Sequence, residues 1–184
     1  MLTGLNCHVI YTVPPSLLHS PNGTNLARLY GRQPLMLPMI PVAKQERGED
    51  ERGIEKLIEI VRKRLSVAGV EAAEATEKRL CVMSGGYVRQ LMTLMQEAVL
   101  YSPDWPIPRE AVEQAIRDLR DGFAIGLRQS QWPILQKVAE SARIESTEEC
   151  AELHENLAVL EYRDAQGPWY DVNPAVREAR EFKP

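Results

Sequence analysis

The sequence predicts a mainly α-helical chain with a short β-rich stretch near its start and a β-hairpin near its end. Apolar residues recur with the 3.6-residue period of a helix from Gly53 onward. A short apolar run, Cys7–Val13, stops at Pro14-Pro15, which is typical of a buried strand that meets a loop. The last third of the chain has the order helix, helix, helix, hairpin.

The N-terminal stretch carries the strand-like patterns. Cys7–Val13 is rich in β-branched and aromatic residues and is predicted to be a buried strand. Asn25–Tyr30 is predicted to be a short helix. Leu35–Val42 is a second apolar run, and we expect an edge strand there because prolines interrupt it.

Two strong amphipathic helices and one weaker helix are predicted in the middle of the chain. The first runs from Gly53 to Gly69 and the weaker one from Glu71 to Val82. Ser84 is predicted to cap the next helix, which Gly85 and Gly86 introduce by a tight turn. The apolar stripes of the two strong helices are Ile54, Leu57, Ile58, Val61 and Leu65, and then Val88, Leu91, Met92, Met95, Ala98 and Val99.

The C-terminal elements are predicted from capping and turn signals. A helix follows Pro108, a shorter one spans Gln131–Ala142, and Thr147 is expected to cap a third that ends near Leu157. Two strand patterns then flank the turn signal at residues 164–167, and Pro174 begins a final short helix. This order is that of a winged helix, in which the hairpin is the wing.

In a winged helix, the third helix is the one presented to a DNA groove. Here it carries four glutamates and neither lysine nor arginine: Glu148, Glu149, Glu152 and Glu155. Carboxylates beside phosphates repel them, so protein packing is favoured over DNA reading for this helix. The formal net charge of −4 likewise argues against strong non-specific binding of nucleic acid.

Composition excludes several classes of protein. No apolar run approaches the ~20 residues of a membrane helix, and the first residues have no signal-peptide pattern, so a cytoplasmic protein without a membrane contact is expected. The three cysteines, Cys7, Cys81 and Cys150, are far apart, and the expectation for each is a buried, unpaired side chain. His154 lies four residues after Cys150, but no second pair of ligands completes a zinc site.

Arg89 is the residue whose position most suggests binding. It lies in the first turn of a predicted helix, directly after the turn formed by Gly85 and Gly86. A cation at the positive end of a helix dipole is mildly unfavourable unless an anion is bound there. A surface ion pair is the alternative role for this side chain.

The segment Ser84–Leu91 (SGGYVRQL) resembles the sensor 2 motif of AAA+ ATPases, particularly of the initiator-like and signalling branches that end in a winged helix. Val9–Pro14 (VIYTVP) is similar to their sensor 1 strand, with Thr12 at the position of its polar residue. Leu157–Tyr162 and Trp169–Pro174 resemble the wing of bacterial ATPases of this kind. The similarity spans nearly the whole chain.

This resemblance implies a mainly α chain with an α/β remnant: the last strands of an AAA+ core in residues 1–45, a helical lid in 46–103, and a winged helix in 104–184. It also implies that Arg89, with Gly85 and Gly86, contacts the terminal phosphate of ATP, and that Thr12 helps to place the attacking water. Arg28 or Arg32 would match the arginine finger, and the complete enzyme would hold Mg²⁺.

The sequence departs from the family in one decisive respect. No glycine is followed by lysine, so the phosphate loop is absent, and no apolar strand ends in paired acids that would hold magnesium. Phosphoryl transfer depends on both parts. The chain alone is therefore not expected to hydrolyse ATP, and an N-terminal ATPase half or a partner subunit is expected to supply the nucleotide. A stand-alone winged-helix DNA-binding regulator and a protein-interaction adaptor are the alternatives.

Overall fold

The computed structural model describes residues 7–13, 23–32, 34–46 and 48–182 of the 184-residue chain. This part is mainly helical, with eight α-helices and one two-stranded antiparallel hairpin near the C-terminus, as predicted. None of the described helices is both long and apolar enough to cross a lipid bilayer. In chain order the elements are α2 (Gly23–Tyr30), α3 (Glu51–Val67), α4 (Glu74–Met83), α5 (Val88–Leu100), α6 (Arg109–Gly126), the 3₁₀ turn η2 (Gln129–Gln131), α7 (Trp132–Ser141), α8 (Glu148–Glu155), β1 (Val159–Asp164), β2 (Gly167–Val172) and α9 (Pro174–Arg177).

Helix α3 begins at Glu51, two residues before the predicted start at Gly53, and ends at Val67, just before the predicted stop at Gly69. The Asp50 carboxylate accepts a hydrogen bond of 2.8 Å from the Gly53 N–H, so it satisfies one of the free donors at the start of the helix. The predicted stripe is buried, with Ile54, Leu57, Val61 and Leu65 all at most 5% exposed. Gly69, at φ +68°, follows the last turn, in the left-handed conformation that glycine adopts most readily.

The corner between α4 and α5 differs from the prediction. Ser84 does not cap α5: it is the C-terminal cap of α4, and its hydroxyl donates to the Cys81 carbonyl at 2.7 Å. The cap of α5 is Tyr87, whose side chain makes no capping hydrogen bond. The prediction was wrong because two glycines with positive φ, Gly85 and Gly86, lengthen the connection by one turn beyond Ser84.

Helix α8 has its predicted cap, and α9 begins at Pro174 as predicted, with Asn173 as its cap. The Thr147 hydroxyl accepts the Cys150 N–H at 3.2 Å, and the Asn173 side chain accepts the Ala175 N–H at 3.0 Å. The hairpin turn is closed by the Asp164 carboxylate, which accepts the N–H groups of Gln166 and Gly167. Its register pairs Val159 with Val172 and Tyr162 with Trp169.

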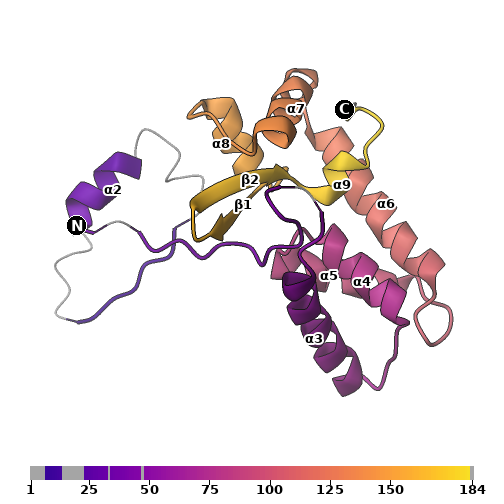
Figure 1. Cartoon of the computed structure of the whole chain (residues 1–184). Helices are drawn as coiled ribbons and strands as arrows, with labels where there is room; N and C mark the ends of the chain where they lie inside the picture. The colour runs from indigo at the N-terminus through magenta and orange to yellow at the C-terminus, as the bar shows by residue number, and fades with distance from the viewer. Residues whose placement is uncertain (1–6, 14–22, 33, 47, 183–184) are drawn as a thin grey trace.

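The hairpin packs on both of its faces, and each face belongs to a different apolar cluster. Leu160, Tyr162 and Trp169 join the cluster formed by α3, α4, α5 and α6. Val159 and Val172 point the other way, because side chains alternate along a strand, and pack with α7 and α8. Figure 1 shows this arrangement: α7 and α8 lie above the hairpin, α3, α4 and α5 lie below it, and α6 runs along its right side, while α2 projects to the left.

Helix α6 extends the first cluster across the boundary expected at residues 103/104. Its buried residues Ala111, Val112, Ala115 and Ile116 pack in the same core as Leu91, Leu94 and Met95 of α5. The described packing is therefore continuous from α3 to the hairpin.

The N-terminal segments differ from their predictions. Residues 7–13 form no strand: they are coil and exposed, and Cys7, expected to be buried, is exposed with them. Residues 35–42 are also coil rather than an edge strand. A strand needs a continuous ladder of backbone hydrogen bonds to a neighbour. Residues 35–42 make only isolated bonds of this kind within the described chain, such as Met39 N–H to the Glu161 carbonyl at 3.2 Å. The stop at Pro14-Pro15 lies outside the described residues.

Candidate functional site

Arg89 is exposed in the first turn of α5, where the helix presents unpaired backbone donors. The first N–H of this helix with a helical acceptor is that of Leu91, which donates to the Tyr87 carbonyl at 3.0 Å. The three preceding N–H groups have no partner within the helix. The first turn contains no acidic residue, and within the described residues the Arg89 guanidinium makes no ion pair. The positive charge of this turn is therefore not balanced by an ion pair within the described residues.

This turn forms one wall of a cavity of about 700 Å³, which we call the Arg89 hollow. Residues 37–40 form a second, mostly apolar wall, and His154, Glu155 and Leu157 close it from the end of α8. The hollow thus combines the exposed Arg89 cation and the exposed Glu155 carboxylate with a mostly apolar surface. Sequence reasoning identified Arg89 but missed the other walls, because they come from segments more than 40 residues away on either side.

The glycine turn has a different role from that expected of a phosphate cradle. The Gly85 N–H donates to the Val82 carbonyl at 3.0 Å, and the Gly86 N–H to the Ser84 hydroxyl at 3.1 Å. The Gly86 carbonyl accepts the Ile40 N–H at 3.2 Å. The turn's own N–H groups are therefore occupied, and anion contact falls to Arg89 and the first turn of α5.

Both glycines permit a close approach of other segments. A Cβ at Gly86 would lie 1.7 Å from the Ile40 carbonyl oxygen, and one at Gly85 would lie 2.2 Å from Cδ1 of Leu160. Gly53 is similar, since its Cβ would lie 1.8 Å from the Pro41 carbonyl oxygen. Residues 39–42 are thus held between α3 and the α4–α5 corner.

The other predicted site residues lie apart from Arg89. Thr12 is exposed in the coil 7–13, Arg28 is exposed in the last turn of α2, and Arg32 is exposed just after that helix. None of the three lines the Arg89 hollow. The structure therefore does not assemble them into a site with Arg89 within the described part of the chain.

Three polar side chains, His154, Tyr170 and Glu161, lie in contact with one another at the hollow. The ring of His154, which lines the hollow, meets the Tyr170 ring edge-on with a centroid distance of 6.2 Å. The Tyr170 hydroxyl donates to the Glu161 carboxylate at 3.4 Å. Burial, followed by the Glu161 charge, raises the pKa of Tyr170, so the phenol stays protonated and acts as a donor.

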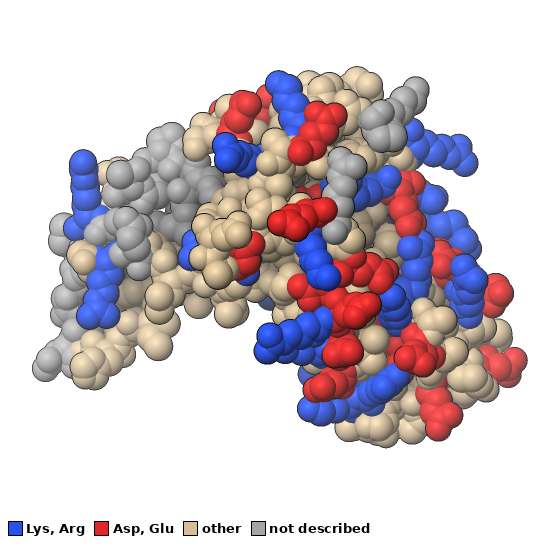
Figure 2. Space-filling model, in the orientation of Figure 1, with Lys and Arg blue, Asp and Glu red and all other residues tan. Residues whose placement is uncertain are grey.

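Helix α8 does not offer the surface of a DNA-reading helix. Its residues include no lysine or arginine, and Glu148, Glu149 and Glu155 are exposed. Arg128 pairs with Glu152 from outside the helix. On the face shown in Figure 2, acidic and basic side chains are interspersed over the lower helices and form no single basic patch. This distribution provides little to attract a phosphate backbone.

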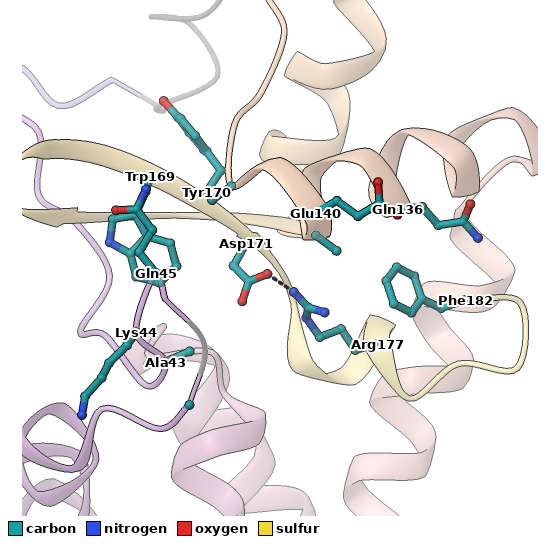
Figure 3. Close-up of a pocket in the computed structure, with 13 residues that line it drawn as sticks. Ala43, Lys44, Gln45, Gln136, Glu140, Trp169, Tyr170, Asp171, Arg177 and Phe182 are labelled. Atoms are coloured by element: carbon teal, nitrogen blue, oxygen red, sulfur yellow. Dashed lines mark hydrogen bonds and ion pairs between the residues drawn. The ribbon is translucent and has the colours of Figure 1, made fainter.

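A second cavity, of about 450 Å³, lies between β2, the end of α7, α9 and the residues Ala43, Lys44, Gln45 and Gly48. Figure 3 shows Arg177 reaching from α9 to Asp171 on β2, with Phe182 beside it. The guanidinium carbon lies 5.8 Å from the centre of the Phe182 ring. Because Asp171 balances its charge, Arg177 is a structural cation here, in contrast to Arg89.

Metal binding finds no support in the described residues, which contain no group of three or more His, Cys, Asp or Glu side chains placed to hold an ion. Cys150 and His154 share a buried face of α8, as their spacing predicts. Burial raises the pKa of the Cys81 thiol to about 12, so this cysteine remains a protonated core residue.

Comparisons of the chain with protein-family models, with curated proteins and with solved structures find no match.

Proposed function

We propose that this chain is the lid and winged-helix portion of an AAA+ ATPase, which senses a nucleotide held by another segment or subunit and does not hydrolyse ATP alone. The observation that supports this most directly is the exposed, unpaired guanidinium of Arg89 at the uncapped start of α5. Of the two roles that its sequence left open, an anion contact is favoured, because no described carboxylate pairs with it.

The α5 wall of the Arg89 hollow suits the anionic end of a ligand, and the wall at residues 37–40 suits its apolar end. Arg89 would fork onto phosphate oxygens, and the first-turn N–H groups of α5 would add to this contact. The apolar wall at residues 37–40 would face the base of a nucleotide. ATP is therefore the proposed cofactor, with Mg²⁺ held by groups that the partner supplies.

The N-terminal segments support a protein partner that carries the nucleotide. Ile10, Leu35 and Leu37 are 94%, 101% and 91% exposed, and large aliphatic side chains this exposed are typical of an interaction surface. An ATPase core would cover them, and pairing with it would bring Thr12 and either Arg28 or Arg32 toward the nucleotide. An adaptor that binds some other protein through this surface is the second candidate.

The test is ATP turnover by the chain combined with a phosphate-loop segment supplied in trans. Arg89→Ala is expected to lower this turnover by roughly 10²-fold, since a stabilising charge near the transferred phosphate is lost. Its effect on the free energy of unfolding should stay within about 0.5 kcal/mol, as for other surface changes. The matched control is Arg64→Ala, an exposed arginine in the last turn of α3.

Three results would count against the proposal. Turnover unaffected by Arg89→Ala would remove the sensing role. A stability loss as large as the loss of turnover would reassign Arg89 to structure. Binding of labelled duplex DNA with a steep salt dependence, in a fluorescence-anisotropy titration, would favour the DNA-binding regulator instead.

A further inference from the structure

Asn173 is a fully buried amide that joins three parts of the fold. It lies between β2 and α9 and is 0% exposed. Its Oδ1 accepts the Ala175 N–H at 3.0 Å, and its Nδ2 donates to the Leu157 carbonyl at 3.0 Å and to Oε1 of Gln90 at 3.2 Å. Gln90 directly follows Arg89 in the first turn of α5. One side chain thus ties the end of the hairpin to the turn that carries Arg89.

The orientation of both amides follows from these partners. Oδ1 of Asn173 must face the Ala175 N–H, so its Nδ2 faces Leu157 and Gln90, and Oε1 of Gln90 must face Asn173. This leaves Nε2 of Gln90 buried with no acceptor among the described residues. A buried donor without an acceptor is destabilising, and a methionine of similar size would avoid it.

A second bond ties the same region to the hairpin. The Tyr162 hydroxyl of β1 donates to the Gly85 carbonyl at 2.8 Å, at the corner that precedes α5. The corner and the first turn of α5 are therefore both bonded to the β1–β2 unit, while Arg89 itself remains exposed. A buried polar group without a full set of hydrogen bonds breaks a general rule of protein cores, and such departures are expected at functional sites.

We propose that Asn173 is a positioning residue: through Gln90 it fixes the first turn of α5, and with it Arg89, to the end of the β1–β2 hairpin. A movement of the β1–β2 hairpin is then coupled to a movement of the first turn of α5, which carries Arg89. The role assigned to Arg89 in this coupling rests on the proposed function, whereas the mechanical link does not.

Gln90→Met is the sharpest variant, because it removes both the acceptor for Asn173 and the unsatisfied Nε2. One N–H of Asn173 then lacks an acceptor, in place of the unpaired N–H groups of Gln90 Nε2, so we expect the melting temperature to change little or to rise slightly. Amide exchange of Leu91, whose N–H donates to Tyr87, should nevertheless become about fivefold faster, while that of Val61 in α3 is unchanged. Asn173→Ser, which keeps a capping oxygen for α9 but is too short to reach Gln90, should give the same local effect.

The second readout is the affinity for ATP of the chain combined with a phosphate-loop segment supplied in trans. Gln90→Met should weaken ATP binding about fivefold when Arg89 is present and should have no further effect in an Arg89→Ala background. Faster exchange throughout α3–α6, unchanged exchange at Leu91, or equal effects in both backgrounds would each overturn the positioning role. If the wild-type assembly binds no ATP, the proposed function fails, and exchange at Leu91 alone decides this inference.

Discussion

The hydroxyl of Tyr162 donates a hydrogen bond of 2.8 Å to the carbonyl of Gly85, 77 residues earlier in the chain. The Tyr162 ring also stacks on Trp169, with a centroid distance of 4.5 Å and an interplanar angle of 28°. Burial raises the pKa of this phenol, so the donor is retained at any ordinary pH. This single side chain links the hairpin to the corner before α5.

Tyr162→Phe should measure how much the hydrogen bond to Gly85 contributes to the free energy of unfolding. The ring and its stacking on Trp169 are kept, but a buried carbonyl loses its donor, so we expect a loss of about 1–2 kcal/mol in the free energy of unfolding. Denaturant titration should show a lower midpoint with an unchanged slope. Tyr101→Phe is the control, since that hydroxyl bonds Asp118 at an exposed position, and it should change stability by less than about 0.5 kcal/mol.

Gly86→Ala should be far more destabilising than Gly69→Ala. Both glycines have positive φ, at +78° and +68°, so both substitutions force an alanine into the left-handed region, at about 1–2 kcal/mol. Only at Gly86 would the new Cβ also meet backbone, 1.7 Å from the Ile40 oxygen, whereas Gly69 has open space. We expect a total above about 3 kcal/mol for Gly86→Ala by thermal or chemical unfolding. Equal effects at the two positions would contradict the close approach of residues 39–42.

Arg79 should be the most important surface arginine for stability. Its guanidinium donates to Glu113 on α6 at 3.0 and 3.2 Å and to Glu178 just after α9 at 2.8 and 2.9 Å. Arg79→Ala leaves both carboxylates without this partner, and we expect a loss of about 2 kcal/mol. Arg79→Lys should recover only part of it, because an ammonium cannot fork onto two carboxylates.

The control for Arg79 is Arg109→Ala, whose side chain is 81% exposed and lies 4.0 Å from the same Glu113. Its loss should stay below about 0.5 kcal/mol in the same unfolding experiment. A larger effect at Arg109 than at Arg79 would show that the ion pairs of Arg79 with Glu113 and Glu178 contribute little to stability.

Stability should fall as the pH rises from about 9 to about 12, in part because of Cys81. Burial raises the pKa of this thiol from 9.0 to about 12 in the native state, so in this window the unfolded chain loses a proton that the native chain retains. The contribution of the Cys81 thiol to stability is therefore fully present below pH 9 and declines above it. Cys81→Ala should flatten this decline relative to wild type in urea unfolding at a series of pH values. A decline of unchanged steepness would contradict the predicted titration of Cys81.

The helices were predictable because their signals are local. The stripe of α3, the Thr147 cap, the start of α9 at Pro174 and the turn at residues 164–167 each depend on neighbours in sequence, and all are confirmed. The strands expected at 7–13 and 35–42 were wrong in the described chain because strand formation depends on a partner that local sequence cannot supply.

The candidate site was predictable only in part. Arg89 stood out because a cation is unexpected at the start of a helix. The walls at residues 37–40 and 154–157 come from segments distant in sequence, which no local pattern joins to α5. The misplacement of Ser84 has the same origin, since the packing of Ile40 and Leu160 against Gly85 and Gly86 decides where α4 ends and α5 begins.

The shared position of the hairpin has a consequence for how the chain unfolds. Val159 and Tyr162 lie on opposite faces of the same strand, so melting that strand removes a wall from both apolar clusters at once. Neither group of helices retains a complete core without it, and the two groups are expected to lose their structure in one cooperative transition rather than in two. A truncated chain that ends before residue 159 would then behave as a collapsed, loosely packed globule. It would do so even though it retains six helices beyond α2, namely α3 to α8.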